Sequence, residues 1–255
     1  MKVFLDYSKY YDLLYKDKDY KKECEFISTY INKFSPKAKS ILSLGCGTCN
    51  HELILAKKNF SIVGIDMSRR MLKIAREKIK INKFGSKIKV YEKDVRKFNF
   101  ENKFDLSIAM FNIVGYQNTN KDFEKMLKNV SNNLKNNGIF MFDCWYMPAV
   151  LKNGPTNKIK VINVGSKKIV RRTFSRLDLN KNLIRITFNI SEIRDKKVIS
   201  KTTETHIMRY WSLPELEYFL EKTGFSILYV CNFMNKDQEI SDKYWNIFVV
   251  ARYRQ

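Results

Sequence analysis

The sequence predicts a doubly wound α/β domain of seven strands that carries an inserted antiparallel β meander. Three observations predict this fold class. Short apolar runs alternate with amphipathic stretches over residues 39–144, which is typical of parallel strands joined by crossover helices. Residues 158–210 alternate in two-residue steps between turn residues, as half-buried antiparallel strands do. A helix and two strands over residues 213–253 then resume the first pattern.

The elements of the first part follow from local signals. Residues 6–34 predict one or two helices and contain Tyr7, Tyr10, Tyr11, Tyr15 and Tyr20. Strands are predicted at 40–44, 61–66, 87–92, 105–110 and 138–144, and helices at 50–58, 69–81 and 121–134. Ser68 and Thr119 are expected N-caps, because their hydroxyls can accept from free N–H groups of the first turn. The Asn-Asn-Gly segment at 136–138 is expected to stop the third of these helices.

The later elements complete the expected organisation. About four meander strands are expected around turns at 163–165, 180–182 and 194–196. A helix at 213–223 ends at Gly224, and strands at 225–231 and 245–253 close the sheet. The expected units are an N-terminal helical lid (1–38), an α/β core (39–150 and 211–255) and an inserted β subdomain (151–210).

The bulk composition restricts the class of protein. A chain of 255 residues with 44% apolar residues is long enough for one large domain with an insertion. It contains no run of 18 uncharged apolar residues, and Asp6 interrupts the place where a signal peptide would be hydrophobic. We therefore expect a cytoplasmic protein without a membrane span. Five cysteines, an odd number, do not suggest a disulfide framework.

The net charge of +22 allows two kinds of partner. Lys and Arg arrays gain affinity for nucleic acid by releasing counterions, and the same positive field attracts small anions. The charge is mostly lysine and is spread along the chain, which favours a solvated basic exterior. A small anionic acceptor substrate is the expected partner, a nucleic acid is unlikely, and the oligomeric state is left open.

The segment Ser43-Leu-Gly-Cys-Gly-Thr-Cys-Asn-His-Glu52 permits three kinds of chemistry. Its Cys-x-x-Cys pair at a helix start could be redox active, but the chain is far longer than a thioredoxin unit. A zinc site is disfavoured, because Cys-x-x-Cys-x-His is too cramped for three ligands and no second pair occurs downstream; no metal is expected. The third possibility is a ligand-binding turn.

The ligand-binding interpretation depends on residues at the ends of three successive strands. Gly45 and Gly47 come directly after a buried strand, where residues without Cβ let backbone N–H groups approach a ligand. Asp66 ends the second strand, where a carboxylate can accept from both ribose hydroxyls. Asp94 comes after the third strand. Because these strand ends meet at one edge of a sheet, they indicate a cofactor that contains adenosine.

With these residues in place, the sequence resembles the class I S-adenosylmethionine-dependent methyltransferases. Their motifs are Gly-x-Gly-x-Gly after strand one, an acid after strand two and an Asp after strand three. The resemblance covers residues 40–144 well and the last two strands adequately. It implies a Rossmann-like fold, S-adenosylmethionine as methyl donor and S-adenosylhomocysteine as product. Ser43 departs from the acid that opens the first motif, and Cys49 from its third glycine.

Further segments resemble a bacterial branch that includes N-methyltransferases of nucleotide-linked amino sugars. The matching segments are Tyr11–Tyr15 with Lys18–Tyr20, Gly47–His51, Met110–Tyr116, Phe142–Tyr146 and Glu204–His206. Tyr116 stands where the amino-sugar enzymes have a histidine near the acceptor, which makes O-methylation as plausible as N-methylation.

The resemblance also implies roles for individual residues. The expected cofactor contacts are Tyr11, Tyr20, Gly45, Cys46, Gly47, Asp66, Met67, Met71, Asp94, Val95 and Phe111. The catalytic candidates are Tyr11, Tyr116 and His206, and Phe111 with Asn112 is where the acceptor should meet the methyl group. A purely structural role also stays open for some of these residues: Tyr11 and Tyr20 as core aromatics, Met71 as a helix core residue and His206 as a structural histidine.

Three functions remain in competition on the sequence alone. The leading one is methylation of an O or N atom on a small, phosphate-bearing acceptor, such as a nucleotide-linked sugar for a capsule or surface polysaccharide, or a phosphoramidate. The second is a nucleic-acid base methyltransferase, although the chain has Phe111-Asn-Ile-Val where such enzymes carry Asn/Asp-Pro-Pro-Tyr/Phe. The third is a non-catalytic binding module, suggested by Ser43 and Cys49.

Overall fold

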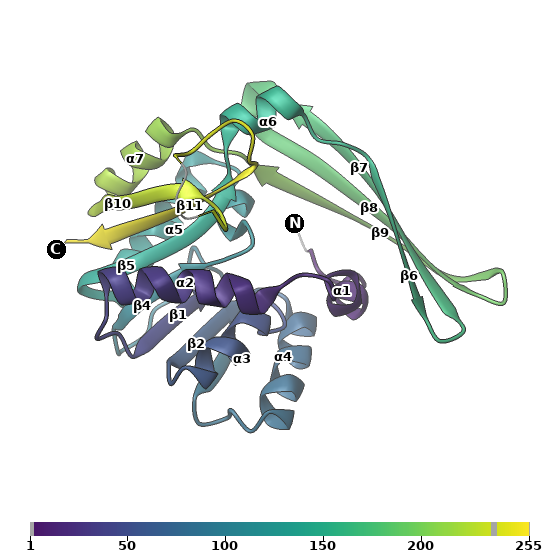
Figure 1. The fold of residues 1–255 in the computed structure, drawn as a ribbon, viewed down its shortest axis with the longest axis horizontal. Helices are drawn as coiled ribbons and strands as arrows, with labels where there is room; N and C mark the ends of the chain where they lie inside the picture. The colour runs from purple at the N-terminus through teal and green to yellow at the C-terminus, as the bar shows by residue number, and fades with distance from the viewer. Residues whose placement is uncertain (1–2, 236–238, 255) are drawn as a thin grey trace.

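The structure, a computed structural model, describes residues 3–235 and 239–254, which form two β-sheets with flanking helices (Figure 1). The strands are β1 (Ser40–Leu44), β2 (Ser61–Asp66), β3 (Ile88–Glu92), β4 (Phe104–Ala109), β5 (Leu134–Trp145), β6 (Lys158–Val164), β7 (Lys167–Asp178), β8 (Leu183–Arg194), β9 (Lys197–Arg209), β10 (Phe225–Asn232) and β11 (Asn246–Tyr253). The helices are α1 (Ser8–Leu14), α2 (Tyr20–Phe34), α3 (Asn50–Lys57), α4 (Arg69–Ile81), α5 (Asn120–Asn133), α6 (Met147–Asn153) and α7 (Leu213–Lys222), with 3₁₀ turns at Ile113–Tyr116 and Leu179–Lys181.

The larger sheet has seven strands in the order β10-β11-β5-β4-β1-β2-β3. Strands β1 to β5 pair in parallel, and β11 is antiparallel to both of its neighbours. The chain runs outward from β1 to β3 and then returns to the other side of β1 at β4. In such sheets ligands bind outside the carboxyl ends of the strands at this reversal. The predicted doubly wound fold is confirmed.

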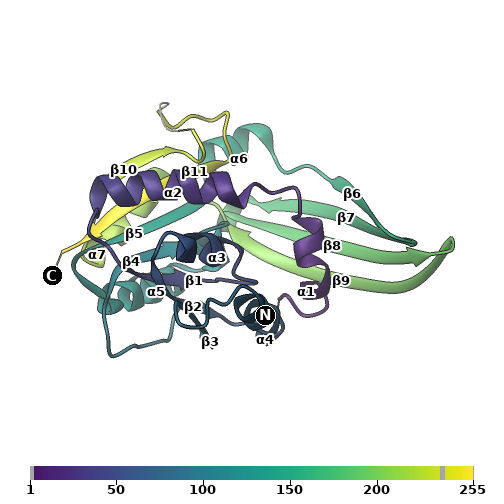
Figure 2. The same ribbon diagram turned by 60° about the horizontal axis from the view of Figure 1, so that its bottom comes forward.

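Helices cover both faces of this sheet. The apolar sides of α2, α3 and α4 pack on one face, where Ile27, Leu55 and Leu72 are fully buried. Those of α5 and α7 pack on the other face, with Phe123 and Leu220 fully buried. Figure 2 shows α2 lying beside β10 and β11, whose rings its own aromatic side chains contact. Within the segment expected to form a lid, α2 is therefore a layer of the core, and α1 stands apart from it.

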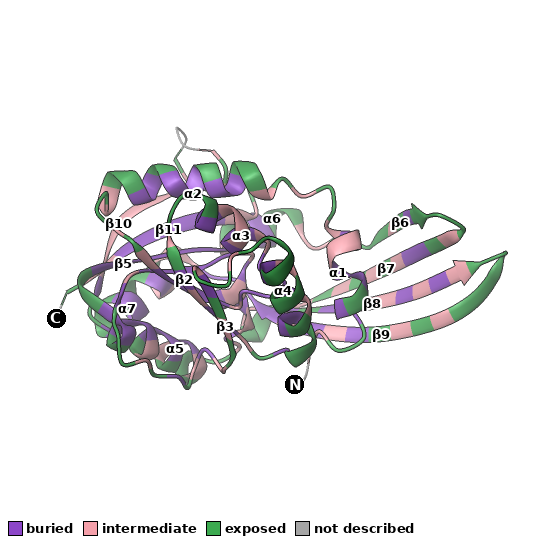
Figure 3. Ribbon diagram, turned by 90° about the horizontal axis from the view of Figure 1, so that it is seen from below, coloured by how far each residue is buried: buried purple, intermediate pink, exposed green. Residues whose placement is uncertain are grey.

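The smaller sheet consists of β6 to β9 in sequence order, all antiparallel, with turns at the expected positions. More exposed and less exposed residues alternate along much of β7 and β8, as expected for half-buried strands (Figure 3). Helix α1 lies between this sheet and α4. It joins them through an apolar cluster that includes Tyr7, Tyr10, Leu14, Met71, Ile162, Ile169 and Ile190.

The local capping signals are confirmed, while one boundary is corrected. Ser68 accepts from the N–H of Met71 and Thr119 from that of Asp122, so both are N-caps. The segment at 136–138 does not separate helix from strand, because α5 ends at Asn133 and β5 begins at the next residue. Instead the segment forms a bulge within β5, which pairs with β4 on both sides of it.

Helix α6 is not predicted from the sequence, because 7 residues are too few to show a helical period. Its proline lies in the first turn, where a helix accommodates it. The helix follows β5 directly and leads into the inserted sheet. Among the described residues, no helix combines the length and apolar character needed to cross a bilayer.

Candidate active site

A cavity of about 1030 Å³, counting its mouth, opens at the carboxyl ends of β1, β2 and β4. This is the place where the reversal of strand order positions a ligand. The core contributes residues 43–48 after β1, Asp66 of β2 and residues 110–113 after β4. Tyrosines in and around α1 and side chains of β8 and β9 line the opposite side, namely Tyr7, Tyr11, Tyr15, Ile186, Phe188, His206 and Met208.

The turn after β1 has the backbone that its glycines require. Gly45 and Gly47 have φ values of +63° and +53°, in the left-handed region that residues with a Cβ rarely adopt. A Cβ on Gly45 would lie 2.3 Å from Cδ1 of Ile113, inside the cavity wall. Cys49 has a φ of +62°, which explains why a glycine would suit its position better.

Asp66 ties the ends of β1 and β2 together. Its Oδ2 accepts from the N–H of Gly47 at 2.9 Å, and its Oδ1 accepts from the N–H of Ser68 at 2.7 Å. Burial raises the pKa of Asp66 to about 6 despite these bonds, and the charge of Glu52 adds to the rise. The carboxylate lines the cavity where a ribose was expected.

Of the other residues expected to contact adenosine, only Met71 lines the cavity. Met71 lines the cavity and is 2% exposed, whereas Met67 is 59% exposed and is not among the lining residues. The carboxylate of Asp94 accepts from the guanidinium of Arg96 at 2.8 Å. Val95 packs in the core beneath the sheet. Asp94 and Val95 are therefore also outside the cavity lining.

The two expected lid tyrosines both line the cavity. Tyr11 packs edge-on against Phe4, and Tyr20 packs edge-on against His51. Burial raises the pKa of Tyr11 well above its ordinary value and that of Tyr20 to about 12, so both phenols stay protonated at neutral pH. His51 itself is held by Glu23, whose carboxylate lies 2.7 Å from Nε2.

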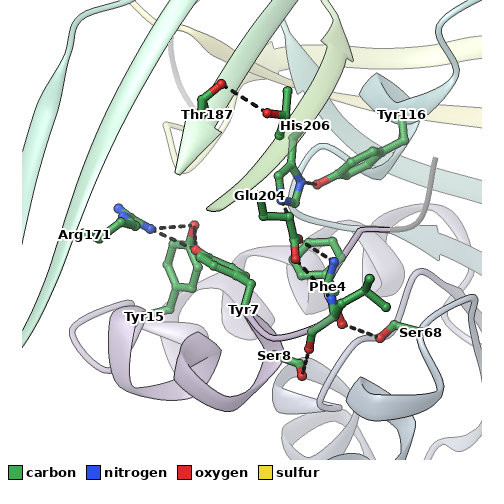
Figure 4. A network of polar contacts seen from close by, with 12 residues as sticks. Phe4, Tyr7, Ser8, Tyr15, Ser68, Tyr116, Arg171, Thr187, Glu204 and His206 are labelled. Atoms are coloured by element: carbon green, nitrogen blue, oxygen red, sulfur yellow. Dashed lines mark hydrogen bonds and ion pairs between the residues drawn. The ribbon is translucent and has the colours of Figure 1, made fainter. Parts of the chain in front are cut away.

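The two remaining catalytic candidates are brought together from distant parts of the chain (Figure 4). The hydroxyl of Tyr116 lies 2.7 Å from Nδ1 of His206, and Nε2 of that ring lies 2.9 Å from Oε1 of Glu204. The carboxylate of Glu204 also accepts from the backbone N–H groups of Phe4 and Leu5. His206 is 2% exposed and lines the cavity together with Tyr116.

The hydrogen bonds determine which nitrogen of His206 carries the proton. Burial opposes ionisation of Glu204, but the bonds from His206 and the N-terminal amides lower its pKa overall. An ionised carboxylate can only accept, so Nε2 of the ring donates to it. Nδ1 is then free to accept from the O–H of Tyr116. Burial raises the pKa of Tyr116 well above its usual value, which keeps this phenol protonated.

Asp143 of β5 supports the loop after β4, a role that is not predicted from the sequence. Its carboxylate accepts from the backbone N–H groups of Phe111 and Asn112. Both of these residues are in the left-handed region, with φ values of +70° and +55°. Two successive residues with a Cβ in this region are strained, so the buried acceptor holds them in place. Asn112 is thereby fixed beside the cavity.

We expect neutralising Asp143 to change how stability depends on pH. Burial raises its folded-state pKa from 3.8 to about 6. The stability contribution of the protonated group is therefore complete below its unfolded value and is lost as pH rises through the folded one. The unfolding free energy of Asp143→Asn relative to wild type should therefore increase by roughly 2 kcal/mol from about pH 4 to about pH 7. Urea unfolding of both proteins checks this, and a difference that does not vary with pH contradicts it.

The cysteine interpretations find no support in the described part of the chain. Cys46 and Cys49 are free and buried, and the pKa of each thiol is raised. Such thiols are poor nucleophiles, because the thiolate is the reactive form. The described residues contain no cluster of three His, Cys, Asp or Glu side chains that could hold a metal ion.

The residues around the cavity fit a nucleoside joined to an amino acid. The glycine turn leaves backbone groups accessible, and Asp66 offers a carboxylate to ribose hydroxyls. Farther along, both amide atoms of Asn112 and the Oε2 atom of Glu52 are buried at the cavity without a hydrogen-bond partner in the described structure. Unpaired buried polar groups are unfavourable until a ligand satisfies them. S-adenosylmethionine has the matching groups.

Comparisons with known proteins agree with this geometry. A family model described as a methyltransferase domain matches residues 35–176. A dTDP-3-amino-3,4,6-trideoxy-alpha-D-glucopyranose N,N-dimethyltransferase of Streptomyces venezuelae is 23% identical over 228 residues, 89% of this chain and 92% of that protein. A putative methyltransferase of Bacillus subtilis (strain 168) is 25% identical over 237 residues, 88% of this chain and 87% of that protein.

Solved structures share the fold. An S-adenosylmethionine-dependent methyltransferase from Clostridium acetobutylicum superposes with a TM-score of 0.80 at 24% identity, covering 96% of each chain. A sugar N-methyltransferase from Streptoalloteichus has a TM-score of 0.81 at 18% identity, covering 96% of this chain and 93% of that one. Because the family model spans more than half of the sequence, this chain belongs to the methyltransferase-domain family and is an S-adenosylmethionine-dependent methyltransferase.

Proposed function

We propose that this enzyme methylates the amino group of a sugar carried on a nucleotide. The observation that carries the proposal is the Glu204–His206–Tyr116 chain, which ends at the cavity beside the loop after β4. A proton acceptor is needed there when the substrate is an ammonium or a hydroxyl. Relatives that cover most of this chain carry names of amino-sugar N,N-dimethyltransferases, which favours nitrogen as the methylated atom.

The cofactor is positioned by side chains at neighbouring strand ends. Asp66 accepts from the ribose hydroxyls, and the glycine turn with Met71 contacts the nucleoside. Tyr11 and Tyr20 cover the end of the cofactor that carries the methyl group. We assign Asp94 no role, because its carboxylate pairs with Arg96 and lies outside the cavity lining. Val95 and Met67 are likewise left out, because the cavity lining does not include them.

The bound cofactor supplies a methyl group already activated by its sulfonium, so the protein must align the acceptor and manage one proton. The acceptor's proton passes to the oxygen of Tyr116 while the Tyr116 proton passes to Nδ1 of His206. The imidazolium that results is stabilised by the carboxylate of Glu204. Because the pKa of Tyr116 is raised, the two transfers are coupled and no free phenolate accumulates.

The segment from Phe4 to Tyr15 acts as the lid. Backbone N–H groups at its start donate to Glu204, and the carbonyl of Phe4 accepts from the hydroxyl of Ser68. The ring of Phe4 packs edge-on against His206 with a centroid distance of 4.9 Å. Release of these contacts would open the cavity, and their formation excludes water from the proton relay.

The charge of the inserted sheet favours an acceptor with phosphates. Residues 158–209 contain fourteen Lys and Arg against four Asp and Glu, a net charge of +10 within the +22 of the chain. One of these residues, Arg171, is half-buried and donates to the hydroxyls of Tyr7 and Tyr15 at the cavity roof. A positive sheet beside the mouth attracts anionic substrates.

A panel of matched acceptors tests the proposal. The purified enzyme is incubated with S-adenosylmethionine and a dTDP-amino sugar, the same dTDP-sugar with a hydroxyl in place of the amine, or the free amino sugar. We expect formation of S-adenosylhomocysteine and of mono- or dimethylated product with the dTDP-amino sugar alone. Mass spectrometry of the acceptor identifies the product.

Two results would overturn this assignment. Turnover of only the hydroxyl analogue would assign O-methylation, to which the relay is equally suited. No turnover with any dTDP-sugar, in enzyme that binds S-adenosylhomocysteine, would show that the acceptor belongs to another class.

A further inference from the structure

The side chain of Glu52 stands out among the groups that line the cavity. It projects from the first turn of α3 and is 2% exposed. Its Oε1 accepts from the hydroxyl of Ser43 at 2.5 Å. Its Oε2 has no hydrogen-bond partner within the described residues. One oxygen of this buried carboxylate is therefore hydrogen-bonded to Ser43 of β1, and the other is unpaired at the cavity.

No cation of the described chain neutralises Glu52. The charge of Lys78 lowers the pKa of Glu52, but Lys78 itself is paired elsewhere. Its ammonium lies 2.7 Å from the carboxylate of Asp12 and also donates to Thr48 and Asn50. His51 is held by Glu23. Burial without an ion pair raises the pKa of Glu52 and makes its charged form unfavourable. A cationic ligand group that entered the cavity would remove this penalty.

The cofactor has two cationic groups, and only one suits this carboxylate. The sulfonium has no N–H and must face the acceptor near Tyr116. The ammonium of the methionine part has three N–H donors and forms short, charge-assisted bonds with carboxylates. Asp66 places the adenosine beside β2, so the methionine part extends toward β1, where Ser43 and Glu52 lie.

We infer that Glu52 binds the ammonium of S-adenosylmethionine. It thereby supplies from α3 the carboxylate that the resembling enzymes have at the position of Ser43. The two residues are nine apart in sequence, and their side chains are hydrogen-bonded to each other. An acid at position 52 can therefore occupy the same part of the site as an acid at position 43. This inference rests on the cofactor placement proposed above, and it is independent of the acceptor.

Calorimetry with two ligands tests the role. Glu52→Gln keeps the shape and the bond from Ser43 but removes the charge. We expect its Kd for S-adenosylhomocysteine to rise roughly ten- to hundredfold. The Kd for 5′-methylthioadenosine, which has the adenosine and no amino acid, should change less than about twofold. Glu221→Gln, an equal charge change at an exposed position of α7, is the matched control.

A second variant moves the acid back to β1. In Ser43→Asp/Glu52→Gln, the new amide can donate to the new carboxylate, which leaves one oxygen for the ammonium. This double variant should recover affinity for S-adenosylhomocysteine to within about fivefold of wild type. Such recovery also shows that the Glu52→Gln loss is not a folding defect.

The outcomes separate the inference from its premise. Unchanged affinity of Glu52→Gln for S-adenosylhomocysteine, or an equal loss for both ligands, overturns the role of Glu52 while the cofactor placement stands. Failure of the wild-type protein to bind either ligand overturns the cofactor placement itself.

Discussion

Replacing His206 by alanine should lower kcat by about a hundred- to ten-thousandfold, the usual contribution of a positioned general base. In the proposed relay the ring is the terminal proton acceptor, and the described residues offer no other imidazole hydrogen-bonded to Tyr116. Its removal should leave the Kd for S-adenosylhomocysteine within about twofold of wild type, because the adenosine contacts come from other strands. Single-turnover kinetics at saturating cofactor and acceptor measure the effect.

Two further variants sharpen this test. Tyr116→Phe keeps the ring and removes the hydroxyl that links acceptor and histidine, so it should reproduce most of the loss in kcat. Thr205→Val changes the residue before His206 on β9, and successive side chains of a strand point to opposite faces of the sheet. The hydroxyl of Thr205 lies 3.2 Å from that of Thr187. That control should retain kcat within about twofold. An unchanged rate in His206→Ala would reduce this residue to a structural role.

Asp66→Asn should weaken binding of S-adenosylhomocysteine by about ten- to hundredfold. The amide can still accept from the N–H of Gly47, so the turn is kept, but it lacks the charge that strengthens bonds from ribose hydroxyls. Asp178→Asn, at an exposed position of the inserted sheet, is the matched control. Calorimetry of the three proteins measures the change, and wild-type affinity in Asp66→Asn would remove this carboxylate from the cofactor site.

The same carboxylate should make cofactor binding depend on pH. Burial raises the pKa of Asp66 to about 6, and ribose hydroxyls bind its ionised form better. The wild-type Kd should therefore rise as pH falls below about 6, by up to about tenfold per unit. Asp66→Asn should show a weaker dependence, which comes from Glu52, because burial also raises the pKa of that cavity carboxylate. A wild-type Kd that is constant down to about pH 5 would show that protonation of Asp66 does not oppose binding.

Signals that act over a few residues could be recognised in the sequence. Ser68 and Thr119 cap helices because a hydroxyl before a first turn has free N–H groups within reach. Gly45 and Gly47 mark a turn for which residues with a Cβ are unsuited. Asp66 reaches the cavity because it ends a strand parallel to β1, and parallel strands end at the same edge. These features determine the fold class and the sheet edge at which the cavity opens.

Side-chain direction beyond a strand end could not be predicted in the same way. Asp94 also follows a predicted strand, but its carboxylate pairs with Arg96 and lies outside the cavity lining. Met67 follows Asp66 directly and is exposed to solvent. Both outcomes depend on which neighbours the folded chain supplies, and a pattern of residue types does not contain that information.

The sequence by itself determined the doubly wound sheet, the inserted meander and the glycine turn at the cavity, because hydrophobic period and turn chemistry are local properties. Only the tertiary structure decided which polar groups meet. His206 is hydrogen-bonded to Tyr116, 90 residues away in sequence, and Glu204 to Phe4, 200 residues away. Glu52 of α3 is hydrogen-bonded to Ser43 of β1. Such pairs form where packing of distant elements excludes water and leaves each buried polar atom only the partners within reach.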